Sequence, residues 1–229
     1  MLPEIYDYLA FTEEIAGLLA EKLANARTAA DIGAIMGELT AYAEGELEKR
    51  LGPEETAHIA CKGGCSACCT VNVAVLVPEA IAIAEFVRKT FSGRELTEIR
   101  AKVEWLADRV RWVDDDERIR LRINCAFLDE RGWCAIHPVR PLLCRALTST
   151  DPELCRRALA SCAYDEEEPI LQNLAHKLLM EGAFREIGKG VERLGMDYRS
   201  MELTRSVKTF LDRPPLVDDF LGRKRISFA

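Results

Sequence analysis

Apolar residues recur at steps of three and four along the first fifty residues, which is typical of amphipathic helices. The pattern predicts a helix over residues 3–24 and a second helix over residues 31–51. Asp31 is the expected N-cap of the second helix, and Gly52-Pro53 is its expected end. Two such helices form an antiparallel hairpin when their apolar stripes face each other. The stripes comprise Ile5, Leu9, Ile15, Leu18, Leu19 and Leu23 in the first helix, and Ile32, Ile35, Met36, Leu39, Ala43, Leu47 and Leu51 in the second.

The spacing of apolar residues changes in the middle of the chain. Residues 71–77 are rich in valine, which predicts either one short strand or an extended connection. A helix is expected to open at Pro78 and run to Phe91, with Gly93 breaking it, and another is expected over residues 96–113. The acidic run that follows, residues 114–117, lacks the alternating ligands and glycine of a calcium loop and is interpreted as a solvated turn.

The last third of the chain returns to helical spacing. A helix is expected over residues 170–194, with Gly182, Gly188 and Gly190 making it irregular, and another over residues 200–211. The acidic run at residues 165–168 is again interpreted as a solvated turn. The segment after Arg213 is expected to be extended or mobile.

Composition narrows the function. The chain has 229 residues, of which 48% are hydrophobic, and a formal net charge of -7. A negative chain whose basic residues cluster only at residues 223–225 is not expected to bind nucleic acid. No apolar run approaches the roughly 20 residues that span a bilayer, and no signal peptide is apparent at the start, so we expect no membrane association and a cytoplasmic location. Nine cysteines in a reducing compartment indicate metal or thiol chemistry rather than disulfides.

The cysteines gather in two stretches that lie far apart in the sequence. The first is Cys61-x3-Cys65-x2-Cys68-Cys69, and the second holds cysteines at positions 125, 134 and 144. Thiolates bind zinc or iron–sulfur centres well, so both stretches are expected to share a metal centre. Adjacent side chains point in different directions, so Cys68 and Cys69 are not expected to bind the same ion. The cysteines could therefore form either one metal centre or two. The predicted metal ligands are Cys61, Cys65, Cys68, Cys69, Cys125, Cys134, Cys144, Cys155 and Cys162, of which the last two could equally be inert buried thiols.

Positive side chains accompany the second stretch. Arg140 and Arg145 bracket Cys144, and a thiolate centre carries negative charge, so both arginines are predicted to donate hydrogen bonds to the bound cofactor. His137 makes a Cys3His zinc site conceivable, but cysteines are in surplus, and we expect it to pack or cap the turn before Pro138. His58 is a weaker alternative ligand. The third histidine, at position 176, is expected to be unrelated to the site.

These motifs resemble a known family. The first cysteine stretch, then Cys125-x-Phe-Leu, Gly-x-Cys134-x-Ile, and Arg140-Pro-x-x-Cys144-Arg145, are similar to the YkgJ-type cysteine cluster family. Its members are described as zinc- or iron-chelating proteins, and related clusters occur in flagellin lysine methylases of the FliB type. The resemblance covers residues 61–145 and implies an iron–sulfur or zinc centre without an assigned reaction. The first two cysteines are separated by one residue more than the family pattern shows.

The same extra residue produces a match to the cysteine spacing of radical S-adenosylmethionine enzymes. Those enzymes usually carry an aromatic residue where Ala67 stands, and their alternating strands and helices are not apparent here. The favoured function is a cytoplasmic metal-binding protein with a cysteine-ligated iron–sulfur or zinc centre, and with a protein partner as a further possibility. The alternative is an iron–sulfur-dependent enzyme, either redox-active or similar to a protein methyltransferase. Whether the protein is an enzyme is left open.

The predicted fold is mostly α, a helical scaffold around an irregular cysteine-rich metal-binding region. A single domain over residues 1–229 is expected to comprise an N-terminal helical hairpin (1–55), a cysteine-cluster core (56–165), C-terminal helices (166–212) and a tail (213–229).

Overall fold

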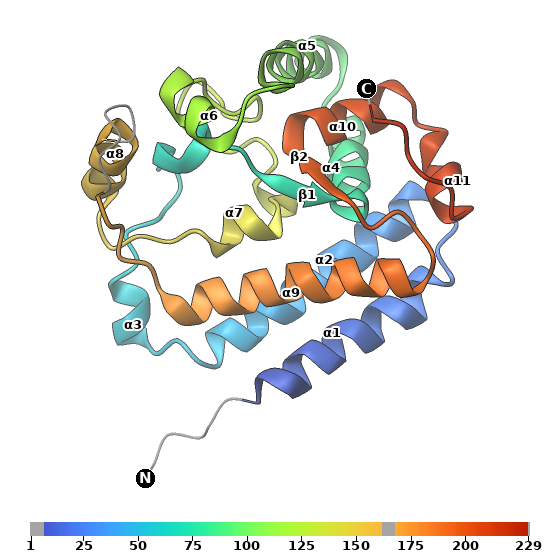
Figure 1. Cartoon of the computed structure of the whole chain (residues 1–229), viewed down its shortest axis with the longest axis horizontal. Helices are drawn as coiled ribbons and strands as arrows, with labels where there is room; N and C mark the ends of the chain where they lie inside the picture. Colours follow the sequence, from blue (N-terminus) through green and yellow to red (C-terminus); the bar gives the residue numbers. More distant parts are fainter. Residues whose placement is uncertain (1–6, 162–167, 229) are drawn as a thin grey trace.

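The computed structural model describes residues 7–161 and 168–228, and it confirms the mostly α fold. The α-helices are α1 (Tyr8–Leu23), α2 (Ala29–Glu48), α3 (Pro53–Ala57), α4 (Val77–Thr90), α5 (Gly93–Val110), α6 (Asp115–Leu121), α7 (Leu142–Ala146), α8 (Pro152–Ser161), α9 (Leu174–Arg193), α10 (Leu203–Asp212) and α11 (Leu216–Leu221). Two short 3-10 helices, η1 (Ala67–Thr70) and η2 (His137–Val139), and two strands, β1 (Ala74–Leu76) and β2 (Ser200–Glu202), complete the described elements (Figure 1).

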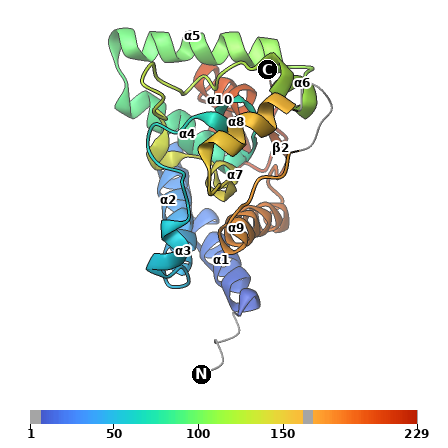
Figure 2. The same cartoon turned by 90° about the vertical axis from the view of Figure 1, so that its left-hand side faces the viewer.

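The helices form one apolar core. The nearly all-round burial of α4 explains its run of small and branched apolar residues, and α4 packs against both α2 and α10. Helix α1 packs against α9 and α2, and α10 also packs against α5. Figures 1 and 2 place α5 and α1 at opposite ends of the molecule, with α4 between them. Among the described residues, none of the helices combines the length and apolar composition that crossing a membrane requires.

The first two helices follow the predicted periodicity with small corrections. Every predicted stripe residue of α2 up to Leu47 is buried. The cap is Thr28 rather than Asp31, because the Thr28 hydroxyl accepts the N–H of Asp31 while the Asp31 carboxylate accepts the N–H of Thr28. In α1 the buried side begins at Phe11, and Leu9, which was predicted to be buried, is 71% exposed. Residues 3–6 of the predicted helix lie outside the described residues.

The glycines of α9 do not interrupt it, contrary to the prediction. This helix runs without a break, although it begins at Leu174 rather than at residue 170. A Cβ at Gly190 would collide with the side chain of Leu19, and one at Gly182 would collide with Tyr8. The glycines therefore allow α1 to approach α9 closely.

The valine-rich segment contains a strand, as one of the two alternatives predicted. Strand β1 pairs antiparallel with β2, in the register Ala74–Glu202, Val75–Met201 and Leu76–Ser200. The predicted helix over residues 200–211 is wrong at its start, since residues 200–202 form β2 and α10 begins at Leu203. The pairing joins two segments that are far apart in the sequence.

Two helix starts in the middle of the chain differ from the prediction. Helix α4 ends at Thr90, before Gly93 as predicted, but Gly93 is itself the first residue of α5, after the N-cap Ser92, so that α5 begins before the predicted residue 96. The acidic run begins α6, with Asp114 accepting the N–H of Glu117 at 2.8 Å and Glu117 accepting the N–H of Asp114. An acidic start stabilises a helix because it complements the helix dipole. Of the second acidic run, residues 165–167 lie outside the described residues.

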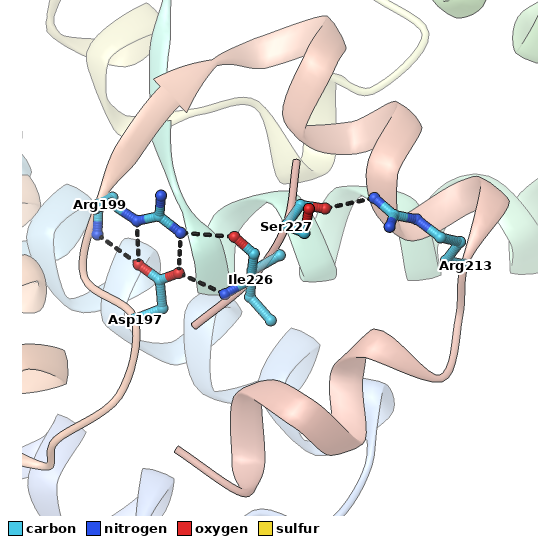
Figure 3. Close-up of polar contacts among 5 residues, drawn as sticks. All are labelled: Asp197, Arg199, Arg213, Ile226 and Ser227. Carbon is cyan, nitrogen blue, oxygen red and sulfur yellow. Dashed lines mark hydrogen bonds and ion pairs between the residues drawn. The ribbon is translucent and has the colours of Figure 1, made fainter. Parts of the chain in front are cut away.

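The C-terminal segment is not the extended tail that was predicted. It contains α11, and the chain then returns to the segment between α9 and β2, where Ile226 is buried beside Asp197 and Arg199. Figure 3 shows the contacts that hold it: the Asp197 carboxylate accepts the backbone N–H of Ile226 at 2.8 Å and pairs with the Arg199 guanidinium at 2.6 Å. Arg199 also donates to the carbonyl of Ile226, and Arg213 donates to the carbonyl of Ser227.

Candidate metal centre

The first cysteine stretch curls into a compact loop. The N–H of Cys65 donates to the carbonyl of Lys62 at 3.0 Å, and the N–H of Cys69 donates to the carbonyl of Ser66 at 2.9 Å, at the start of η1. Between them, Gly64 has a φ of +84°, a conformation that glycine adopts without strain. The local backbone geometry therefore keeps Cys61, Cys65 and Cys68 close together in one turn.

The second stretch begins with a tight hairpin. Leu128 and Cys134 form an antiparallel bridge, and the N–H of Ala135 donates to the carbonyl of Phe127 at 2.8 Å. The Asp129 carboxylate accepts the N–H of Trp133 at 2.8 Å and so fixes the turn. The chain then passes through η2 into α7, which carries Cys144.

The two stretches contact each other directly. The N–H of Cys125 donates to the carbonyl of Cys69 at 2.7 Å, which places a cysteine of each stretch side by side. The ring of Trp133 covers Gly63 so closely that a Cβ at Gly63 would collide with it. The buried Glu79 carboxylate accepts the N–H of Leu142 at 2.9 Å and thereby ties the start of α7 to α4.

Seven of the nine predicted cysteine ligands line one cavity of about 240 Å³. They are Cys61, Cys65, Cys68, Cys69, Cys125, Cys134 and Cys144. Cys155, on α8, does not line this cavity, and Cys162 lies outside the described residues. Within residues 7–161 and 168–228, no three histidine, cysteine, aspartate or glutamate side chains converge into a ready site for one metal ion. The thiols thus share a cavity without meeting at a single point.

Electrostatic contacts divide the thiols into two groups. The inner group is Cys68, Cys69, Cys125, Cys134 and Cys144. In it, the Cys144 sulfur interacts with those of Cys125, Cys68 and Cys134. The outer group is Cys61, Cys65 and Cys155, and Cys61 interacts with the other two and with Cys68. Cys68 therefore interacts electrostatically with both groups.

Burial and one hydrogen bond shift the pKa values of the inner thiols. It raises the pKa of both Cys125 and Cys144 above the ordinary thiol value. A hydrogen bond between the side chains of Cys68 and Cys69 lowers the pKa of Cys68 and raises that of Cys69. Because metals bind thiolates rather than thiols, loading this cavity must release protons.

Cations surround the thiols. Lys62, Arg118, Arg140 and Arg145 line the same cavity, together with one carboxylate, that of Glu202. The Nε of Arg140 is buried and, among the described residues, has no hydrogen-bond partner. A buried donor without a partner is costly, and an anionic thiolate–metal centre in the cavity would satisfy it. The donor set of seven sulfurs and the unsatisfied guanidinium therefore fit a thiolate-bound metal centre.

A family comparison agrees with this geometry. Residues 60–168 match the CxxCxxCC family model, which is described as a "Putative zinc- or iron-chelating domain". Residues 60–168, here called the CxxCxxCC domain after that model, contain all seven cysteines that line the cavity. The match confirms the cysteine-cluster resemblance and supports metal binding, and its description names zinc and iron equally. Searches of the curated proteins and of the solved structures gave no match.

Arg145 supports the CxxCxxCC domain through hydrogen bonds. Its guanidinium donates to the carbonyls of Arg140 at 2.8 Å, Pro138 at 3.1 Å and His137 at 3.3 Å, and it pairs with Glu44 of α2. These contacts hold the loop that presents Arg140. The prediction that both arginines donate to the cofactor itself stays a prediction.

Two cavity residues were missed in the sequence. Arg118 is 2% exposed and interacts with Cys125 and Glu202, but it follows an acidic run that gave no sign of burial. His176 was expected to be unrelated, yet it lines the cavity from α9, beyond the residues that the CxxCxxCC model matches. Burial, and then the charge of Arg140, lower the pKa of His176, so its ring is neutral near pH 7. His137 lines the cavity but is largely exposed, and His58 caps the end of α3.

Proposed function

We propose that this protein binds an iron–sulfur cluster through cysteine thiolates of the CxxCxxCC cavity, in a reducing compartment such as the cytoplasm. The observation that carries the proposal is the set of seven thiols around one cavity. A structural zinc ion takes four ligands. The cavity of about 240 Å³ and its surplus of sulfurs suit a centre with several metal atoms.

The inner group supplies the preferred ligands. Cys144 interacts electrostatically with Cys68, Cys125 and Cys134, and these four come from η1, the hairpin and α7. When bound, such a centre supplies electron transfer or Lewis acidity, while the chain itself supplies charge balance. The neighbouring arginines of the cavity, at positions 118 and 140, offset the negative charge of the thiolates.

The second candidate is a zinc centre, which the family description favours equally. Zinc and iron share thiolate ligands, so the residues alone do not separate them. A zinc centre predicts a colourless protein in which four sulfurs of the inner group bind one ion, whereas a cluster predicts visible absorption and acid-labile sulfide.

Anaerobic purification, followed by metal analysis, sulfide analysis and a visible spectrum, tests the proposal. We expect a brown protein with iron and sulfide in similar amounts. Cys144→Ser should remove most of the iron, whereas Cys155→Ser, outside the cavity, is the matched control and should retain it. A colourless protein with stoichiometric zinc would replace the cluster by the second candidate. A protein that binds neither metal when loaded anaerobically contradicts both.

A further inference from the structure

His176 is held in the wall of the cysteine-lined cavity by the start of α9. The side chain of Asn173 caps this helix by accepting the N–H of His176 at 2.9 Å. The N–H of Asn173 itself donates to the Thr148 hydroxyl at 2.9 Å, shortly after α7 in the chain. Helix α9 also packs along α7, which carries Cys144, as Figure 1 shows. The first turn of α9 is therefore anchored to the segment of the CxxCxxCC domain that presents Cys144.

One nitrogen of the imidazole is buried and lacks a partner. Within the described part of the chain, this nitrogen is Nδ1. Burial, and then the charge of Arg140, lower the pKa of the imidazole, whereas the backbone carbonyl of Arg145 acts in the opposite direction. A metal-binding histidine commonly donates its other ring N–H to a carbonyl, and Arg145 offers such a carbonyl beside this ring.

We propose that Nδ1 of His176 is a ligand of the metal centre, so that the centre has mixed sulfur and nitrogen coordination. This inference rests on the proposed function, and it adds a ligand from outside the residues 60–168 that the family model matches. It also explains why a buried histidine nitrogen lies unsatisfied at a cavity lined by seven thiols. If the centre is a cluster, an imidazole in place of a thiolate raises its reduction potential.

The histidine at position 137 provides the comparison. His137 lines the same cavity, but it is largely exposed and is not among the buried unsatisfied groups. A role in which His176 only accepts a hydrogen bond from Arg140, whose Nε is also unsatisfied, is the competing interpretation. The two roles differ in whether nitrogen lies in the metal's coordination sphere.

The test compares the unmodified protein with His176→Ala, His176→Cys and the control His137→Ala. Each is loaded anaerobically with iron and sulfide, and separately with zinc alone, and is examined by metal analysis, X-ray absorption and release of metal to a chelator. We expect His176→Ala to lose the nitrogen scatterer and to release metal at least about 10-fold faster, because the loss of an outer-shell partner alone lowers metal affinity about 10- to 100-fold. His137→Ala should match the unmodified protein, and His176→Cys should retain the metal with one more sulfur scatterer.

The outcomes separate the two proposals. An unmodified protein that binds no metal contradicts the proposed function. An unmodified protein that binds metal with the same coordination and release rate as His176→Ala overturns the His176 inference alone. If His176→Ala does not fold, His176→Cys decides: an added sulfur scatterer supports ligation, and an unchanged coordination sphere contradicts it.

Discussion

The helical core and the cysteine loops of this protein are held together by different means. Ile15, Leu39 and Ile81, in α1, α2 and α4, are fully buried, and each belongs to one continuous apolar cluster. Residues 61–70, all within the described part of the chain, include no fully buried side chain and are joined to Cys125 by a backbone hydrogen bond. Apolar burial stabilises the first region, whereas residues 61–70 have little of it, and we expect the proposed metal centre to supply the additional stability of the cysteine loops.

Metal removal should have the largest effect and should act on one region only. Structural zinc contributes roughly 10–16 kcal/mol in small metal-binding modules, and whole domains are stable by only about 5–15 kcal/mol. We expect chelation to abolish hydrogen-exchange protection over residues 58–70 and to reduce it over residues 123–150, where Phe127, Ile136 and Leu142 stay in the apolar cluster, while α2, α4 and α9 keep theirs. Mass spectrometry of peptides before and after complete chelation measures both regions in one experiment.

The outcome that contradicts this comparison is equally specific. If exchange, helicity and melting temperature are all unchanged in protein shown to be free of metal, the cysteine loops are stable without a centre. If α2 and α4 lose protection together with the loops, the two regions form one cooperative unit.

Leu39→Ala should have the opposite effect to metal removal: it should destabilise the helical core and leave metal binding unchanged. Leu39 lies fully buried in α2, far in the sequence from the inner cysteines, and truncation of such a residue destabilises by about 2–5 kcal/mol. We expect denaturation of the metal-loaded variant to occur at lower denaturant concentration, with metal content per folded protein unchanged. Leu9→Ala, at an exposed position in α1, is the control and should change stability by less than about 0.5 kcal/mol.

The same contrast explains how much of the structure the sequence predicts. Helices α2, α4 and α5 follow from apolar periodicity because their burial is one-sided or their ends are clearly marked. The strand pairing of residues 74–76 with 200–202 and the return of the chain at Ile226 depend on contacts between distant segments, which leave no local pattern. The error at Gly182 and Gly190 has the same origin, since contacts with α1 explain these glycines and their own helix does not.

The candidate site also contains residues that the sequence predicts and residues that only the packing reveals. The cysteines are recognisable by their spacing, and seven of them do line one cavity, although their role as ligands stays a prediction. Arg118 and His176 lie on helices whose sequences are ordinary, and only the packing of α6 and α9 near the cysteine loops brings them to the cavity. Residue type predicts the soft ligands because few other roles gather thiols, whereas arginine and histidine have many roles.

Glu79 tests the connection between the two regions. Its carboxylate accepts the N–H groups of Leu76 and Leu142, each at 2.9 Å, and burial raises its pKa to about 7. A carboxyl whose pKa is higher in the folded state than the ordinary 4.5 binds its proton more tightly when folded, so its contribution to stability falls as the pH rises from about 4.5 to about 7. The full change is on the order of 3 kcal/mol for that difference in pKa.

Glu79→Gln should remove the pH dependence of stability that Glu79 causes between about pH 4.5 and 7. The amide offers one acceptor instead of two, so we expect a loss of about 1–3 kcal/mol at low pH, where one N–H loses its partner. The free energy of unfolding, measured by denaturant for both proteins at several pH values, gives a difference that should shrink toward pH 7. Because both proteins carry the same thiols, proton competition at the metal cancels in that difference. A difference that is constant between about pH 4.5 and 7 contradicts the raised pKa.

The smallest effect comes from one substitution placed in each region. Gly64, in the cysteine loop, has a φ of +84°, so Gly64→Ala should destabilise the loop by about 1 kcal/mol and quicken metal release. A Cβ added to Gly45, in α2, would meet no neighbouring side chain within 4 Å, so Gly45→Ala should stabilise the helix by about 0.5–1 kcal/mol. Denaturant titration and chelator competition on both variants should give shifts of opposite sign. Equal shifts would mean that the loop tolerates alanine by adjusting its backbone, and the metal centre would then not depend on the turn at Gly64.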